Sequence, residues 1–172
     1  MAYLSRSTEL VGAGIQPGCG LGCLRFGMQQ DQVEKVVAGE GRTERVEDGE
    51  YSYRVLNYEK AGISLFFAES TGKLTSIEVA RNSQCTLYDK QIFGLRRREV
   101  VSFVMQNLAA KGSGGGVEET DREAIGEFGV YVPDLRLSLY FDLADNLQEV
   151  HWGLFYDSAD EIVWPDIDAT EP

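Results

Sequence analysis

Internal similarity constrains the fold of this chain more than any other feature of its 172 residues. Three blocks of the first half recur in the same order in the second half, at offsets of 67, 74 and 73 residues. The paired blocks are residues 26–36 with 93–103, 62–67 with 136–141, and 74–79 with 147–152. Ordered blocks at nearly constant spacing are typical of a duplicated structural unit. We therefore predict that the chain contains two copies of one unit.

Each copy begins with a helical pattern. Apolar residues fall at helical spacing at Val33, Val36 and Val37 in the first copy and at Val100, Phe103, Val104 and Leu108 in the second. Because glycine commonly ends a helix, we expect the first helix to stop at Gly39 and the second before Gly112. Residues 112–116 are glycine and serine only, which predicts a flexible loop.

Strands with period-two alternation follow each helix. Asp48-Gly49 lies between residues 42–47 and 51–58, and this dipeptide is a strong hairpin signal. The expected fold class is α+β: two tandem repeats, each a helix followed by an antiparallel meander of three or four strands, with the helices packed on one sheet face. A single domain spans 1–172, with repeats at about 15–83 and 91–157 and an acidic tail at 158–172.

Alternation sorts the strand residues into two faces. The helix side should carry the apolar set Ile63, Leu65, Phe67, Ile77, Val79, Leu137, Leu139, Phe141, Val150 and Trp152. The other side should carry Leu56 and six candidate partner-binding residues: Tyr58, Phe66, Tyr131, Tyr140, His151 and Phe155. Aromatic anchors rimmed by charge are typical of protein interfaces. The alternative is that the amino-terminal segment, Trp164 and the tail, or the other repeat covers this face.

The distribution of charge narrows the class of partner. The chain holds 16 Lys plus Arg and 28 Asp plus Glu, a net charge of −12, with a balance of +1 over residues 1–111 and −13 over residues 112–172. Nucleic-acid binding needs clustered cations, so this class is excluded. We expect the acidic segment to steer a basic partner through six carboxylates: Glu118, Glu119, Asp121, Asp157, Asp160 and Glu161. The alternative is that these groups only keep the protein in solution.

The glycine-rich stretch near the amino terminus is interpreted as structural. Gly18, Gly20 and Gly22 do not have the spacing of a dinucleotide fingerprint, and the Gly-Lys-Ser/Thr ending of a phosphate loop is missing. Glycine permits unusual backbone dihedrals, so we expect a tight lead-in to the first helix.

Metal and catalytic signals are weak. Cys19, Cys23 and Cys85, with a single histidine, do not supply four zinc ligands, so we expect free thiols. His151 has the chemistry of a general base, but no nucleophile motif accompanies it. We therefore predict no metal, no cofactor and no enzymatic activity.

The expected location is the cytoplasm. No stretch of 18 apolar residues is present, and the first nine residues lack the basic and apolar regions of a secretory signal. An odd number of cysteines does not form a disulfide framework.

The segment Ile15-Gln16-Pro17-Gly18, followed by Gly20-Leu21-Gly22, Phe26-Gly27-Met28 and Val33, resembles the opening of small bacterial proteins. These include immunity proteins encoded beside secreted toxins and the outer-membrane SmpA/OmlA lipoproteins. The tandem arrangement resembles the beta-lactamase inhibitory protein architecture, although that protein is secreted and disulfide-bonded, and the lipoproteins carry a lipidated amino-terminal cysteine. The resemblance implies a binding protein that uses its sheet face, and a cytoplasmic immunity role fits best.

The leading hypothesis is a non-enzymatic protein that neutralises a toxin or other effector by occlusion through its sheet face and acidic surface. A first alternative is a small-ligand-binding or enzymatic domain with a pocket between the repeats near His151. A second alternative is an assembly protein that self-associates through the same sheet face.

Overall fold

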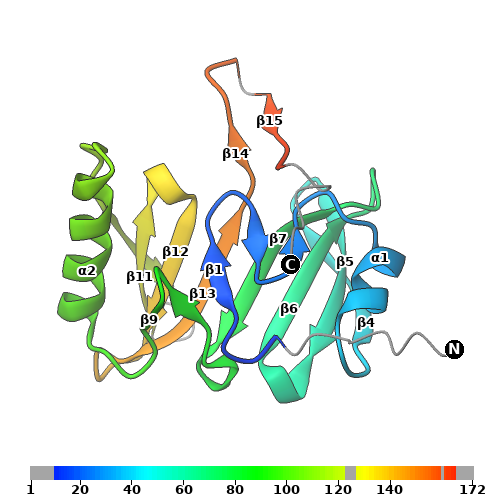
Figure 1. Cartoon of the computed structure of the whole chain (residues 1–172), viewed down its shortest axis with the longest axis horizontal. Coiled ribbons are helices and arrows are strands. Elements are labelled where there is room, and N and C mark those ends of the chain that lie inside the picture. Colours follow the sequence, from blue (N-terminus) through cyan, green and yellow to red (C-terminus); the bar gives the residue numbers. More distant parts are fainter. Residues whose placement is uncertain (1–9, 123–126, 160, 166–172) are drawn as a thin grey trace, which may run out of the picture.

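The structure is a computed structural model that describes residues 10–122, 127–159 and 161–165. A broad sheet forms the body, two helices lie toward its opposite ends, and a narrow hairpin projects from it (Figure 1). Among the described residues, no helix is long and apolar enough to cross a membrane.

The main sheet has eight antiparallel strands. In spatial order they are β10 (Glu118–Arg122), β11 (Glu127–Val132), β12 (Leu137–Phe141), β13 (Leu147–Gly153), β7 (Leu74–Ala80), β6 (Ile63–Ala68), β5 (Tyr51–Tyr58) and β4 (Arg42–Asp48). Four strands come from each half of the chain. The halves meet at the centre, where Val150 of β13 lies opposite Val79 of β7. The predicted hairpin at Asp48-Gly49 is confirmed, because Asp48 pairs with Tyr51 across a two-residue turn.

The predicted fold class, two helix-plus-meander repeats, is wrong. Strands make up 46% of the described structure and helices 20%, and the strands of both halves form one continuous sheet. The reason is that a meander ending at β7 or at β13 would leave a row of backbone N–H and C=O groups unpaired. Pairing of the two strands, from Glu149 with Ala80 to Gly153 with Ser76, satisfies those groups.

A second sheet of five short strands was not predicted. It consists of β3 (Leu24–Arg25), β2 (Gly20–Leu21), β1 (Gly14–Gln16), β8 (Thr86–Leu87) and β9 (Lys90–Gln91), in that order. Its strands come from the glycine-rich segment and from the connection between the two halves. The structural role predicted for the glycines is confirmed at Gly20, where a Cβ atom would collide with the carbonyl oxygen of Leu24.

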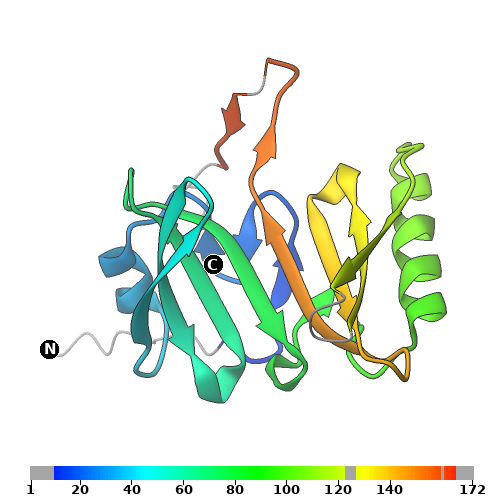
Figure 2. The same cartoon turned by 180° about the vertical axis from the view of Figure 1, so that it is seen from behind.

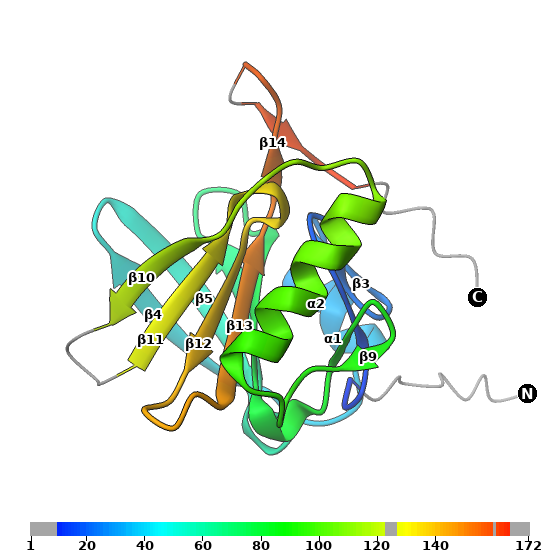
Figure 3. The same cartoon turned by 90° about the vertical axis from the view of Figure 1, so that its left-hand side faces the viewer.

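Both helices start with a capping box. The backbone N–H of Gln29 donates to Oε1 of Gln32 (2.8 Å) at the start of α1 (Gln30–Val36), and that of Arg96 donates to Oε2 of Glu99 (2.9 Å) at the start of α2 (Arg97–Ala110). α2 ends before Gly112 as predicted. α1 ends earlier than predicted, at Val36, because the backbone is already extended at the next residue. Figure 3 shows α2 alongside the strands of the second half.

Strand alternation correctly placed the apolar set assigned to the helix side, although Leu56 and Tyr58, which it assigned to the other side, are buried as well. Every residue of the apolar set assigned to the helix side is at most 2% exposed. In the described part of the chain, 3₁₀ turns at η1 (Glu59–Ala61), η2 (Arg81–Ser83) and η4 (Pro133–Leu135) link strands. Short links of this kind keep consecutive strands adjacent, so one core forms beneath the whole sheet.

Trp152 joins the two sheets. Its side chain is 1% exposed, and its indole Nε1–H donates to the carbonyl oxygen of Gly20, 3.2 Å away in β2. The indole therefore fills the space between the sheets and also satisfies a backbone acceptor of the smaller one.

Replacement of Trp152 tests this connection. Trp152→Phe keeps an aromatic ring but removes the hydrogen bond to the Gly20 carbonyl, so the free energy of unfolding should fall by about 1–3 kcal/mol. Trp152→Ala also leaves a cavity and should lower it by about 3–5 kcal/mol. Urea denaturation measures both. Leu143→Ala is the control, because Leu143 is 77% exposed and should change stability by no more than about 0.5 kcal/mol. Equal midpoints for all three variants would contradict the connection.

Candidate functional site

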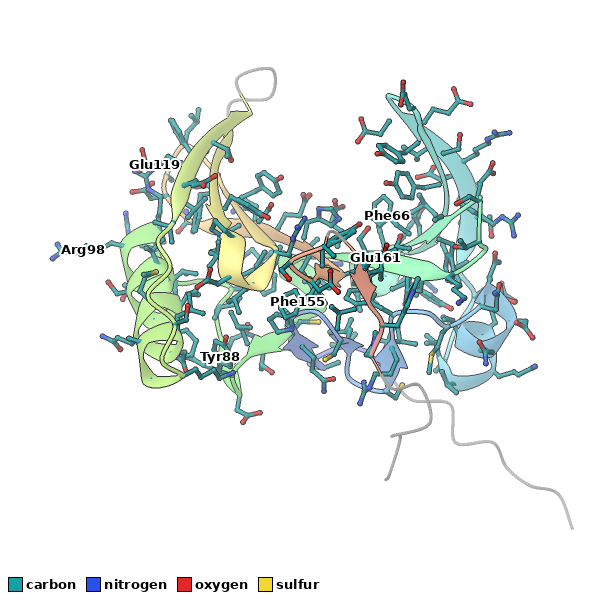
Figure 4. All side chains as sticks on the ribbon, turned by 90° about the horizontal axis from the view of Figure 1, so that it is seen from above. Phe66, Tyr88, Arg98, Glu119, Phe155 and Glu161 are labelled. Atoms are coloured by element: carbon teal, nitrogen blue, oxygen red, sulfur yellow. The ribbon has the colours of Figure 1, made fainter. Side chains whose placement is uncertain are left out.

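The sheet surface that faces away from the helices is open. In Figure 4 the strands at both ends of the sheet rise on the side opposite the helices, and in Figure 2 the same surface faces the viewer with no described helix over it. One directly paired row crosses all eight strands: Glu118, Tyr131, Ser138, His151, Glu78, Ser64, Asn57 and Arg42. We call the surface that carries this row, together with Tyr53, Phe66 and Tyr140, the open face.

Four of the six predicted partner-binding residues lie on the open face. Phe66, Tyr131, Tyr140 and His151 alternate with buried residues along their strands, and each is partly exposed. Phe66 is the centre of a small cluster, because its ring centroid lies 5.7 Å from that of His151 and 6.3 Å from that of Tyr53. Sequence reasoning missed Tyr53, because Tyr53 lies three residues from Leu56, and the assignment of Leu56 to this face put Tyr53 on the core side.

Tyr58 and Leu56 were assigned to the wrong face. Tyr58 pairs with Ile63, and Leu56 pairs with Leu65, so both point into the core. Tyr58 is 5% exposed, and burial, followed by the nearby Glu34 carboxylate, raises the pKa of its hydroxyl. The error arose because the turn η1 sets the register between β5 and β6, and the sequence does not show that register.

Phe155 also lies apart from the open face. It begins β14 (Phe155–Tyr156), and its ring packs so closely on Gly18 that a Cβ atom there would collide with it. It lines a different cavity, of about 470 Å³, together with Tyr88 and Leu108. β13 ends at Gly153, so the alternation that placed Phe155 did not continue through the break.

The predicted acidic residues occupy two separate places. Glu118, Glu119 and the backbone of Asp121 belong to the edge strand β10. Oε1 of Glu119 lies 4.0 Å from Nη1 of Arg97 in α2. Asp157 and Glu161 lie at the end of the projecting hairpin, where Oδ1 of Asp157 accepts the backbone N–H groups of Ala159 and Glu161 at 2.8 and 3.0 Å. Asp160 lies outside the described residues. Figure 4 shows Glu119 and Glu161 well apart.

A groove of about 380 Å³ lies between the open face and the base of this hairpin. The hairpin consists of β14 and β15 (Ile162–Val163). Sheet residues such as Tyr53, Ser76 and His151 form one side of the groove, and Tyr156, Ile162 and Trp164 form the other. We call it the hairpin groove. Tyr156, Ile162 and Trp164 are 44%, 38% and 37% exposed, so this is where large apolar surface remains open.

Two cations stack on aromatic rings at the groove. Cζ of Arg136 lies 4.6 Å from the ring centroid of Tyr156, and Nζ of Lys73 lies 4.7 Å from that of Trp164. Both contacts tie the hairpin segment to the body of the protein. Burial and then the nearby Asp48, Tyr156 and Tyr51 side chains raise the pKa of Tyr53, so its hydroxyl stays protonated and able to donate.

The central row contains Ser138, His151 and Glu78 on three neighbouring strands. These are the residue types of a hydrolytic triad, but acyl transfer also needs free N–H groups that bind the oxyanion. Ser138 lies in β12, which pairs with β11 on one side and β13 on the other, so the surrounding backbone N–H groups are used within the sheet. The backbone beside Ser138 therefore does not provide the N–H donors of an oxyanion site.

The three cysteines are free: Cys19 is exposed, Cys23 is partly buried and Cys85 is fully buried. Burial raises the pKa of the Cys85 thiol. Among the described residues, no group of three or more His, Cys, Asp or Glu side chains is arranged to hold a metal ion.

Comparison of the chain with protein-family models, with curated proteins and with solved structures finds no match.

The corrected position of Tyr58 has a measurable consequence. Tyr58→Ala removes a buried ring and should lower the free energy of unfolding by about 3–5 kcal/mol. Tyr131→Ala removes a partly exposed ring from the open face and should cost about 1 kcal/mol or less. Thermal or urea unfolding of the two variants distinguishes these outcomes. If Tyr131→Ala were the more destabilised, the two faces would be assigned wrongly.

The cysteines should differ in reactivity. A raised thiol pKa reduces the thiolate fraction at neutral pH, and burial blocks access, so Cys85 should react with a disulfide reagent only after unfolding. Cys19 is exposed and should react in the native state. Mass spectrometry of the labelled protein, with and without denaturant, identifies each site. Rapid native labelling of Cys85 would show that the segment around it opens.

Proposed function

We propose that this chain is a non-enzymatic protein-binding protein that holds its partner on the open face. The observation that carries the proposal is that Phe66, Tyr131, Tyr140 and His151 share one sheet face with no described helix over it. Partly exposed aromatic side chains on a fixed scaffold lose little entropy on binding and still have apolar area to bury.

The projecting hairpin adds a second part to this surface. The exposed apolar side chains Tyr156 and Ile162 pair across the hairpin, and the carboxylates of Asp157 and Glu161 lie in the turn beside them, which suits contact with a partner that has a basic surface. The net charge of −12 supports long-range attraction of such a partner.

Within this class we propose the role of an inhibitor that covers the working surface of a toxin or effector, as an immunity protein does. The sequence resemblance of the glycine-rich opening supports this narrower role. We also propose a cytoplasmic location, which the three free cysteines support, because disulfides form and persist in oxidising compartments.

A small-ligand-binding role near His151 is the alternative that one observation favours, since His151 lines the hairpin groove of about 380 Å³. A low-molecular-weight compound that stays with the purified protein, without any protein partner, would favour this alternative.

Paired purifications test the proposal. Wild-type protein should co-purify from its native host with a protein at a fixed stoichiometry. The Tyr131→Ala/Tyr140→Ala double variant should weaken that complex by about 30-fold or more, as loss of interface anchors does. Added salt should slow association, because exposed charges are screened. Surface plasmon resonance on the recovered partner measures both effects.

The matched control is Arg98→Ala, an exposed change on the outer flank of helix α2 and well away from Phe66 (Figure 4), which should leave binding unchanged. A complex that survives the open-face variant and is lost with the helix variant would place the interface elsewhere. Light scattering that shows only self-association, with no protein partner recovered, would contradict the proposal.

A further inference from the structure

The hairpin groove differs in charge from the rest of this acidic chain. The chain holds 28 aspartate and glutamate residues, yet none of the described residues that line the groove is acidic. The lining includes a cation, Arg136, and Lys73 lies close by over the ring of Trp164. A groove with this lining selects a ligand group of negative charge.

Arg136 is held in position for binding. Cζ of its guanidinium lies 4.6 Å from the ring centroid of Tyr156, and this cation–π contact holds the group at the groove that Arg136 and Tyr156 both line. Among the described residues, no carboxylate forms an ion pair with Arg136 or with Lys73. A guanidinium with this geometry can bind both oxygens of a carboxylate at once.

The backbone at Arg136 adds an independent observation. Arg136 follows the turn η4 with φ +49°, in the left-handed region. The matching position after η1 in the first half of the chain is Gly62, with φ +64°. Glycine adopts this conformation without strain, whereas arginine does not. An arginine therefore occupies this unfavourable backbone conformation at position 136. It is one of only two basic residues in the segment 112–172, which contains 15 acidic residues.

The rest of the lining suits a carboxylate on an apolar stem. Tyr53 and Ser76 supply hydroxyl donors, and Ile162 and Trp164 supply apolar walls. Hydroxyl and guanidinium donors together can satisfy the four acceptor positions of a carboxylate.

We propose that the hairpin groove binds a glutamate or aspartate side chain of the partner protein, with Arg136 as its principal ligand. This inference rests on the proposed function, because a folded partner that lies across the open face presents side chains there rather than a chain terminus. The partner surface then carries basic groups that meet the acidic hairpin end and one acidic side chain that enters the groove. Because positive and negative groups alternate along this surface, the partner can bind in only one relative position without placing like charges together.

A peptide titration tests the ligand chemistry. The probes are Ac-Ala-Leu-Glu-Leu-Ala-NH₂ and its counterparts with Gln or Lys in place of Glu, none of which has a free terminal carboxylate. Titration into the intact protein is followed by amide NMR shifts and by Trp164 fluorescence, since Trp164 lines the groove and Trp152 is buried. The Glu peptide should bind at least 10-fold more tightly than the Gln peptide, and the Lys peptide should bind least.

Two variants test the residue. Arg136→Gln and Arg136→Gly should each weaken the Glu peptide by at least 10-fold, and Arg98→Gln on α2 should not. Arg136→Gly also relieves the strained backbone, so its Tm should lie within about 2 °C of the wild type or above it. Loss of peptide binding with an unchanged or raised Tm separates recognition from folding.

Three outcomes would overturn the inference: tighter binding of the Lys peptide, equal binding of the Glu and Gln peptides, or no effect of either Arg136 variant. The same variants are then measured against the recovered partner. If Tyr131→Ala/Tyr140→Ala abolishes that complex while Arg136→Gln leaves it intact, the proposed function stands and this inference fails. If the Glu peptide depends on Arg136 but no protein partner is recovered, the groove chemistry stands and the proposed function fails.

Discussion

The pairing of β7 with β13 is the contact on which the rest of the structure depends. Five directly opposed residue pairs, with Val150 and Val79 at the centre, join the four strands of each half into one sheet. Without this ladder each half would end in an unpaired central strand, and each core would be open along one side. With it, the residues beneath the sheet form one cluster that also includes the apolar residues of the five-stranded sheet. The hydrogen bond from Trp152 to Gly20 lies just beneath this junction.

One consequence concerns how the open face can act. Its central strands have neighbours on both sides, so their backbone groups are used within the sheet, and recognition there depends on side chains. Catalysis that relies on backbone donors is disfavoured for the same reason. The scaffold is stiff, since six of its eight strands are internal, and partly exposed rings such as Phe66 and Tyr140 are held at fixed positions. Rigid aromatic anchors of this kind suit a protein interface.

Sequence patterns predicted the buried face well, because alternation along one strand is a local property. The patterns failed wherever the face assigned to one strand had to be extrapolated across a turn or a break to the next strand. Tyr58 was misplaced because η1 sets the β5–β6 register, and Phe155 was misplaced because β13 ends at Gly153 before it. The continuous sheet was missed because the β7–β13 pairing joins residues far apart in sequence, and its register leaves no local signal. The small sheet was missed because its strands have only two or three residues each, too short to show a period.

The distribution of charge also differs between the sequence and the folded structure. Summed along the chain, the charged residues of 112–172 are 15 acids and only two basic residues, which gives this segment a strong negative charge. In three dimensions one of the two basic residues of that segment, Arg136, stacks on Tyr156 at a groove whose described lining holds no carboxylate. The net charge of the molecule and the charge of the described groove lining therefore have opposite signs. The far field governs how fast a partner arrives, and it falls off over about 8 Å in physiological salt. The hairpin groove acts only when the partner is in contact, so the choice of partner depends on the few residues, such as Arg136, whose charge is opposite to that of the whole molecule.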